Sequence, residues 1–227
     1  MRRREGPRRD AVLIVSFGEE WLINGERFTS FGAGLHDRPV TTEHGGRSFG
    51  IHVDLAPPAA YVLFGLPMHL LAQQVVSIED VLDEPSLADR LHDAGGWADR
   101  FRALDDVIAK RLADARPPSA GVVWAWGRLL ETDGRVAVGT LAEQLGWSRK
   151  RIVARFREEV GLPPKTVARL LRFDRARTLA ERTQRPDWAR IALECGYYDQ
   201  SHLINDFRAI TGRTPETFLQ DTAAAAA

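Results

Sequence analysis

The chain has 227 residues, of which 44% are hydrophobic and 27% are charged, and its formal net charge is zero. This composition is typical of one or two globular domains. It excludes collagen-like and low-complexity proteins, and a single cysteine excludes an internal disulfide. The sequence contains no run of 18 apolar residues and no signal-peptide pattern, so we expect a cytoplasmic protein without a membrane partner.

The two parts of the chain differ in charge. Residues 136–220 carry 15 Lys and Arg against 10 Asp and Glu, whereas the rest of the chain carries 16 against 21. A net charge of +5 in one part therefore offsets −5 in the other. Because nucleic acid phosphates attract a basic surface, the C-terminal part is the expected site of nucleic acid binding.

Residues 1–10 form an Arg-rich segment that contains Gly6 and Pro7. Terminal segments of this kind are usually solvated, so we expect a flexible basic arm. Contact between the arm and DNA is the alternative.

Residues 11 to about 67 show the pattern of short strands. Val12–Phe17 is an apolar run typical of a buried strand, and Phe49–Leu55 alternates apolar and polar residues. Asn24-Gly25 is a strong signal of a tight hairpin. Tyr61–Phe64 follows a turn at Pro57-Pro58. About five strands can be counted, which indicates a small sheet.

Helical signals follow the strands. Ser77–Asp80 resembles a helix cap, and Pro85-Ser86 starts a further helix. After Gly95-Gly96, the segment Trp97–Ala115 carries apolar residues at helical spacing. Such a stripe packs more often in a core than in a contact between two chains, and both readings stay open.

Two similar helical units follow a linker at residues 117–119 and a helix at residues 120–131. Each unit has a short helix, a glycine and a second helix. Gly146 and Gly196 stand where a helix ends in a left-handed residue, which costs least for glycine. Ser148 fits the N-cap of the next helix in the first unit, and Asp199 or Gln200 opens the corresponding helix in the second.

Apolar pairs bury one face of each unit. They are Leu141 with Leu145, Ile152 with Phe156, Ile191 with Cys195, and Leu203 with Phe207. We therefore interpret Cys195 as a core residue. The arrangement is that of a helix–turn–helix, whose second helix enters the DNA major groove.

The two units together resemble the DNA-binding domain of AraC-type (AraC/XylS) transcription regulators, over roughly the last hundred residues. The second unit carries the most specific residues, which are Ile191-Ala192-x3-Gly196-Tyr197-x2-Gln200-Ser201-x-Leu203-x3-Phe207-Arg208-x3-Gly212-x2-Pro215-x2-Phe218. The first unit carries Leu141-Ala142-x3-Gly146-x-Ser148-x3-Ile152-x3-Phe156-Arg157-x3-Gly161-x2-Pro164. Two units in this order are far more specific than one.

The resemblance implies an α+β chain of two domains. A small sheet-and-helix domain, compatible with an incomplete cupin-like barrel, is expected at residues 11–116. An all-α domain with two helix–turn–helix units joined by a long helix is expected at residues 120–220. Residues 221–227 form a low-complexity tail without an assigned role. In regulators of this family, helices after the sensory sheet often form the dimer, so Trp97–Ala115 is the candidate homodimer helix.

The resemblance also implies the partners. We expect double-stranded promoter or operator DNA to bind the C-terminal domain. The N-terminal domain is expected to sense a small-molecule effector or to dimerise. RNA polymerase is a further expected partner of a bacterial regulator of this kind, and no cofactor is expected.

The recognition helix of the first unit is expected to direct Arg149, Lys150 and Val153 outward. Arg149 or Lys150 can donate to guanine O6 and N7, and Val153 can contact a thymine methyl group. Similar regulators commonly have an arginine where this chain has Ala154, which weakens base readout at that position. Arg155 is expected to contact a phosphate instead.

The recognition helix of the second unit is expected to direct Gln200, Ser201, Ile204 and Asn205 outward. Gln200 and Asn205 carry amides that suit adenine N6 and N7. His202 is expected to contact a phosphate.

A long helix at Lys165–Arg182 joins the two units. At about 1.5 Å per residue it spans roughly 27 Å, close to the roughly 34 Å between successive major-groove faces. We therefore expect the two recognition helices to read adjacent grooves on one side of the DNA. The arginines of this helix are expected to be solvated or in salt bridges.

An enzyme is the alternative class of function. His36, His44 and His52 lie in the strand region, and a cupin-like sheet can hold a metal ion. Their spacing lacks a close His-x-His pair, so we expect satisfied or exposed histidines, no metal site and no catalysis. A DNA-binding protein without an effector is a third possibility.

Overall fold

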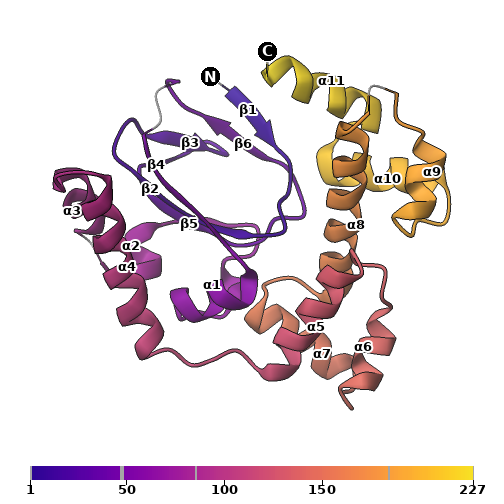
Figure 1. The fold of residues 1–227 in the computed structure, drawn as a ribbon, viewed down its shortest axis with the longest axis horizontal. Helices are drawn as coiled ribbons and strands as arrows, with labels where there is room; N and C mark the ends of the chain where they lie inside the picture. Colours follow the sequence, from indigo (N-terminus) through magenta and orange to yellow (C-terminus); the bar gives the residue numbers. More distant parts are fainter. Residues whose placement is uncertain (1, 47–48, 85, 184, 227) are drawn as a thin grey trace.

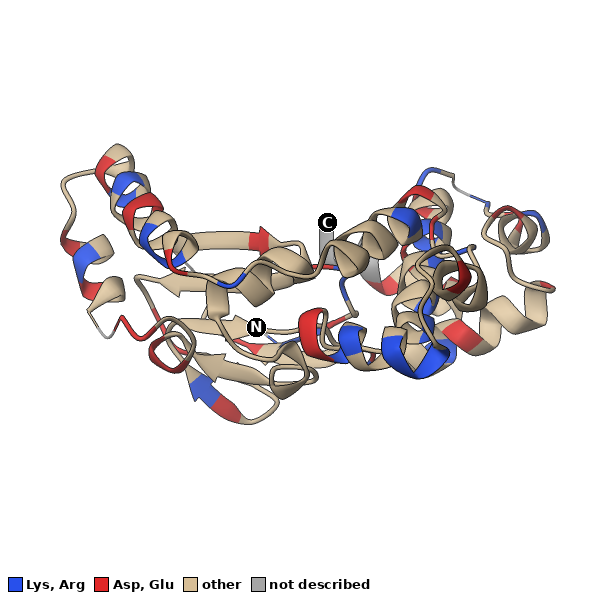
Figure 2. Cartoon of the chain, turned by 90° about the horizontal axis from the view of Figure 1, so that it is seen from below, with Lys and Arg blue, Asp and Glu red and all other residues tan. Residues whose placement is uncertain are grey.

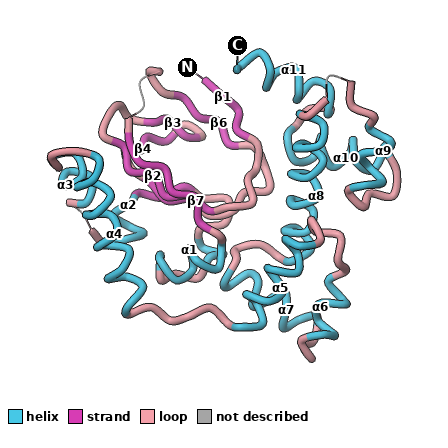
Figure 3. The backbone as a smooth tube through the Cα atoms, viewed as in Figure 1, coloured by secondary structure: helices cyan, strands magenta, loops and turns pink. Residues whose placement is uncertain are grey.

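The computed structural model describes residues 2–46, 49–84, 86–183 and 185–226. An N-terminal part with two β-sheets lies beside a C-terminal part built from helices (Figures 1 and 3). The expected α+β fold class is therefore confirmed. Within the described ranges, no helix is both long enough and apolar enough to cross a membrane.

Two antiparallel sheets of four strands each form the N-terminal part. The first has the order β7-β2-β5-β8, with β7 at Gly50–Leu55, β2 at Ala11–Ser16, β5 at Phe31–Ala33 and β8 at Val75–Ser77. The second has the order β1-β6-β3-β4, with β1 at Arg2–Glu5, β6 at Val40–Glu43, β3 at Trp21–Ile23 and β4 at Glu26–Phe28. The sheets curve towards each other (Figure 1). Residues of both sheets line a cavity between them.

The strongest strand signals are confirmed. Strand β2 alternates fully buried Ala11, Leu13 and Val15 with partly exposed neighbours, because successive side chains of a strand point to opposite faces. Asn24 and Gly25 both have positive φ, 51° and 91°, which is the backbone of the tight hairpin that joins β3 to β4.

Two expectations for the strands are wrong. The described residues contain eight strands, not about five. The four that the sequence did not predict, β1, β5, β6 and β8, have only three or four residues each, too few to show an alternating pattern. Tyr61–Phe64 is not a strand but the end of helix α1 (Pro57–Phe64). The two prolines occupy the first positions of this helix, where a missing N–H costs nothing, and Gly65 ends it with φ of 67°.

The expected flexible arm is ordered in the structure. Arg2–Glu5 forms β1, which pairs with β6 along its full length, and Arg2 forms an ion pair with Glu43. Farther along, Gly6 lies beside Phe218, and Arg4 lies against Gly212 in the C-terminal part. The sequence misses this strand because its stability comes from a partner strand about forty residues away.

Helices cover one end of the sheets. They are the short 3-10 helix η1 (Met68–Leu70), α2 (Ile78–Leu82), α3 (Leu87–Asp93) and α4 (Trp97–Ala113). The expected cap at Ser77 is confirmed, because its hydroxyl accepts a hydrogen bond from the Asp80 backbone N–H. Arg111 of α4 donates to the carbonyl oxygens of Leu63, Phe64 and Val81, so it stabilises the C-terminal ends of α1 and α2.

Helix α4 buries one face and exposes another. Leu104 and Val107 lie in the N-terminal core, which agrees with the commoner reading of the stripe. Trp97, Phe101 and Leu112 are 41%, 50% and 49% exposed. The use of this helix in a homodimer stays a prediction.

Helices α5 to α11 make up the C-terminal part. Their bounds are α5 Ala120–Glu131, α6 Val138–Gln144, α7 Arg149–Glu159, α8 Pro164–Glu181, α9 Trp188–Glu194, α10 Gln200–Thr211 and α11 Pro215–Ala226. The joining helix is therefore found within one residue of its expected ends. The alanine-rich tail continues α11 to Ala226, as expected of the residue with the highest helix propensity.

The two parts share buried contacts. Leu35, which follows β5, is 1% exposed and belongs to the core of the C-terminal part. Glu159 at the end of α7 is fully buried and accepts hydrogen bonds from the backbone N–H and hydroxyl of Ser119 in the linker. The linker is therefore fixed to the first helix–turn–helix unit.

Candidate nucleic-acid interface

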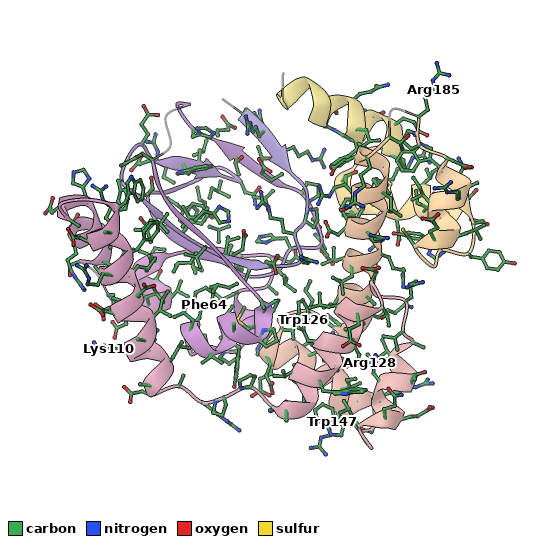
Figure 4. All side chains as sticks on the ribbon, in the orientation of Figure 1. Phe64, Lys110, Trp126, Arg128, Trp147 and Arg185 are labelled. Carbon is green, nitrogen blue, oxygen red and sulfur yellow. The ribbon has the colours of Figure 1, made fainter. Side chains whose placement is uncertain are left out.

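The first unit consists of α6, a turn and α7. Gly146 ends the first helix with φ of 61°, and the Ser148 hydroxyl caps α7 by accepting a hydrogen bond of 3.1 Å from the Arg151 N–H. Leu141, Ile152 and Phe156 are fully buried. Trp147, labelled in Figure 4, packs so closely on α5 that a Cβ atom on Gly121 would be 2.4 Å from its ring.

The second unit repeats this geometry with α9 and α10. The Tyr197 N–H donates to the Ala192 carbonyl at 2.9 Å, just as the Trp147 N–H donates to the Ala142 carbonyl at 2.8 Å. Gly196 has φ of 74°. Asp199 is the N-cap of α10, because its carboxylate accepts a 2.7 Å hydrogen bond from the His202 N–H. The turn of the second unit is therefore one residue longer.

Helix α7 places its predicted residues in two different environments. Arg149, Lys150 and Ala154 are exposed, and Val153 is partly buried. Arg149 and Lys150 have no ion-pair partner in the described part of the chain. Arg155, predicted to contact a phosphate, instead pairs with Glu158 at 2.8 Å and with buried Glu159. Its contact with a phosphate stays a prediction.

Helix α10 exposes most of its predicted residues. Gln200, Ser201 and Asn205 are exposed, and Ile204 is partly buried. His202 is also exposed, but its Nδ1 accepts a hydrogen bond of 3.4 Å from the Tyr198 N–H within the turn. This bond orients the His202 ring and leaves Nε2 available for a phosphate.

Three further arginines lie on the recognition helices. Arg157 follows Lys150 by seven residues and Arg208 follows Asn205 by three, so each lies on the outward face of its helix, and both are exposed. Arg151 is exposed too, and its guanidinium stacks 4.7 Å from the centre of the Trp147 ring. The sequence alone could have predicted the outward direction of Arg157 and Arg208, because each lies close to a whole number of helical turns from a residue that was predicted to contact DNA.

The arginines of α8 differ from those of α7 because they are engaged within the chain. Arg169 pairs with Asp206, Arg175 with Asp133, and Arg177 with both Asp174 and Glu181. The expectation of salt bridges on this helix is confirmed for these three residues. In Figure 2 the Lys and Arg residues, drawn in blue, are spread over several helices of the C-terminal part. Arg149, Lys150, Arg157 and Arg208 of the recognition helices, by contrast, are exposed and have no ion-pair partner in the described ranges.

A buried polar cluster fixes α10 against α8. Arg169 donates to Asp206 at 2.8 Å, Arg172 donates to the Gly134 carbonyl at 3.2 Å, and the Arg172 guanidinium lies 5.5 Å from the centre of the Tyr197 ring. Burial raises the pKa of the Tyr197 hydroxyl, so it stays neutral. Because Asp206 adjoins Asn205, this cluster sets the rotation of α10 and thereby the direction of the Asn205 amide.

The three histidines of the strand region lie in separate environments. His36 Nδ1 bonds to the Gly34 carbonyl, His44 stacks on Trp21, and His52 bonds to Asp54. Among the described residues, no group of three or more His, Cys, Asp or Glu could hold a metal ion.

The cavity between the two sheets has a volume of about 200 Å³. Its wall is mostly apolar and is formed by both sheets, with Val12, Ile14 and Phe31 from one and Trp21 and Val40 from the other. The N-terminal segment after β1 closes one side with Glu5, Arg8 and Asp10.

Comparison with known proteins agrees with this geometry. Residues 141–221 match the family model of a helix-turn-helix domain. No curated protein sequence matches the chain. ToxT from Vibrio cholerae is similar in structure over 96% of this chain and 92% of that chain, with 10% identity and a TM-score of 0.51.

Two further solved structures are similar. ToxT bound to (E)-4-(8-methylnaphthalen-1-yl)but-3-enoic acid covers 96% of this chain and 94% of that chain, with 11% identity and a TM-score of 0.52. The xylose-binding transcription activator XylR is 22% identical over 48% of this chain, with a TM-score of 0.39. The chain spans only 29% of XylR. At these identities the ToxT likeness concerns the fold.

The matched region contains both helix–turn–helix units except the start of α6, and it defines a DNA-binding domain. This domain is of the AraC type. The chain accordingly carries a DNA-binding domain of the kind found in transcription regulators.

Proposed function

We propose that this regulator reads one DNA site in two adjacent major grooves, with α7 in one groove and α10 in the next. The observation that carries the proposal is the repeated geometry of the two units, each of which exposes the N-terminal half of its second helix. Base edges in the major groove are reached by this part of a recognition helix.

The length of α8 supports adjacent grooves. It has 18 residues, and at about 1.5 Å per residue it spans about 27 Å. One turn of DNA separates successive major-groove faces on one side by about 34 Å. Both units pack on α8 and share one core, so the two recognition helices approach the DNA as one rigid body.

The two helices carry different chemistry. Arg149 and Lys150 of α7 donate only, which suits the guanine acceptors O6 and N7. Gln200 and Asn205 of α10 both donate and accept, which suits adenine N6 and N7. Val153 adds a thymine methyl contact, and Ser201 can bond to several bases. His202, Arg157 and Arg208 contact phosphates in this arrangement.

The N-terminal part senses a small-molecule effector in the cavity between its sheets. A mostly apolar, concave site with a few polar groups is the usual form of a small-molecule site. A solved structure of ToxT contains a bound carboxylic acid, and ToxT shares the fold of this chain. Binding of the effector then changes the affinity of the regulator for DNA. RNA polymerase is the protein partner of the regulator at the DNA site.

Selection of random DNA duplexes by the purified full chain tests the two-groove proposal. The selected sequences are expected to share two blocks whose centres lie about 10–10.5 base pairs apart. One block, or enrichment without any shared sequence that disappears at higher salt, would contradict the proposal. The second result would mean that the phosphate contacts alone bind DNA, as in an architectural protein.

A further inference from the structure

We propose that the turn at residues 132–135, which joins α5 to α6, fixes the spacing at which the two helix–turn–helix units read DNA, and that Arg172 of α8 is its positioning residue. The inference rests on the proposed reading of two grooves and names the residues that hold the two units in register. The turn directly precedes the first unit in the sequence, but it contacts both α8 and the turn of the second unit.

The turn has a closely defined backbone. Asp133 and Gly134 have positive φ, 48° and 72°. The Asp133 N–H donates to the Leu130 carbonyl at 3.0 Å, and the Gly134 N–H donates to the Leu129 carbonyl at 2.8 Å. These two bonds are those of a Schellman motif, which ends a helix and fixes the direction of the following chain. The turn therefore sets the direction in which the chain leaves α5 towards α6.

Three contacts tie the turn to one face of α8. A Cβ atom on Gly134 would lie 2.8 Å from the Ala168 carbonyl carbon, so the backbone of the turn lies directly on the backbone of α8. Arg172 donates to the Gly134 carbonyl oxygen at 3.2 Å, and Arg175 lies 3.7 Å from the Asp133 carboxylate. Residues 168, 172 and 175 share one helix face because they are four and three positions apart.

The same turn contacts the second unit. A Cβ atom on Gly196 would lie 2.8 Å from Cγ of Arg135, so the Arg135 side chain packs on the turn between α9 and α10. The Arg172 guanidinium lies 5.5 Å from the centre of the Tyr197 ring, within the range of a cation–π contact. Arg172 therefore contacts the turn before the first unit and the turn within the second unit at the same time.

This arrangement has a consequence for the spacing of the two DNA blocks. Adding one base pair between the blocks moves the second block along the DNA by about 3.4 Å and rotates it by about 35°. Two units in a fixed relation can follow only one spacing. Because the turn at residues 132–135 holds both α8 and the second unit, it restricts rotation of one unit relative to the other, and the chain prefers one spacing.

Titration of the full chain with three DNA duplexes tests the inference. One is a selected duplex, and the other two have a spacer one base pair longer or shorter. We expect the unsubstituted chain to bind the altered duplexes at least about tenfold more weakly. Arg172→Met removes the hydrogen bond and the charge and keeps an unbranched side chain, and in this variant the ratio should fall to about threefold or less.

Arg177→Met is the matched control. It removes the same charge from the same helix, but the partners of Arg177, Asp174 and Glu181, both lie within α8. The spacing preference of this variant should equal that of the unsubstituted chain. A thermal melt of both variants verifies folding.

A distance measurement without DNA tests the same inference independently. Spin labels are attached at Glu143→Cys in α6 and Ala189→Cys in α9, because both positions are exposed and the native Cys195 is buried. Pulsed electron resonance is expected to give one narrow distribution of label distances in the unsubstituted and Arg177→Met backgrounds. In the Arg172→Met background the distribution should broaden.

The other outcomes overturn the inference. A full spacing preference or a narrow distance distribution in Arg172→Met would mean that packing on α8 alone sets the spacing. Equal weakening on all three duplexes with a lower melting temperature would mean that Arg172 only stabilises the fold. Equal affinity of the unsubstituted chain for the three duplexes would mean that the units are not held at one spacing. Selection of a single DNA block would instead contradict the two-groove proposal, and the label distances would still test the turn.

Discussion

Gly196 occupies a position where both the backbone and the packing exclude a Cβ atom. Its φ of 74° lies in the left-handed region, and a Cβ atom would be 2.8 Å from the Arg135 side chain. We expect Gly196→Val to destabilise the chain by about 1–3 kcal/mol, because a β-branched residue strongly resists this conformation. For a chain of this length the melting temperature should fall by several degrees.

Gly127 provides the matched control for this prediction. It lies inside α5, and a Cβ atom there would meet nothing within 4 Å. Gly127→Ala is expected to raise the melting temperature slightly, since alanine stabilises a helix interior by about 0.5–1 kcal/mol. An unchanged melting temperature in Gly196→Val would show that the turn of the second unit is assigned wrongly.

Local chemistry made single residues predictable in some places and not in others. The caps at Ser148 and Asp199 and the positive φ of Gly146 follow from a few neighbouring residues, and all three are found. The ion pair of Arg155 with Glu159 could not be predicted, because the burial of Glu159 depends on its contact with Ser119 of the linker, forty residues away in the sequence. Arg111 was missed because its three carbonyl partners come from distant helix ends.

The recognition helices and α8 are all rich in basic residues, but Arg157 of α7 and Arg208 of α10 are exposed and have no carboxylate partner in the described ranges, whereas Arg175 and Arg177 of α8 are paired. The double variant Arg157→Ala/Arg208→Ala is therefore expected to lower the slope of log K for DNA against log salt by about 1–2, since each lost phosphate contact removes about 0.9. The measurement is a titration of one selected duplex at several salt concentrations.

The double variant Arg175→Ala/Arg177→Ala serves as the control with equal loss of charge. These side chains are neutralised by Asp133, Asp174 and Glu181, so the slope should change by much less. Equal changes in the two double variants would mean that net charge, rather than the exposed faces of α7 and α10, determines the binding of DNA.

The sequence predicted the helical elements better than the strands. Helices α6 to α10 have apolar residues at regular spacing and local caps, so their existence and their order along the chain could be derived. Strands β5 and β8 have three residues each, and they pair with each other although they lie far apart in the sequence. Helix α1 was missed for a different reason. Pro57-Pro58 is compatible both with a turn and with the start of a helix.

The whole molecule joins a closed cavity to a DNA-binding surface through shared contacts. Glu5 at the end of β1 and Arg8 after it line the cavity, and Arg4 of the same strand lies against Gly212 at the end of α10. Leu35 and Glu159 add a common core and a fixed linker. Neither the cavity nor these contacts could be derived from the sequence, because each depends on residues brought together from several elements.

The central claim is that each recognition helix reads its own block of one DNA site. Its most direct test is selection of random duplexes with the chain and with two variants, Arg149→Ala/Lys150→Ala and Gln200→Ala/Asn205→Ala. We predict that each variant relaxes the sequence preference in one block only, by about 1–3 kcal/mol per lost base contact, and leaves the other block unchanged. Equal weakening of both blocks in either variant would contradict the claim and would assign these side chains to the phosphate backbone.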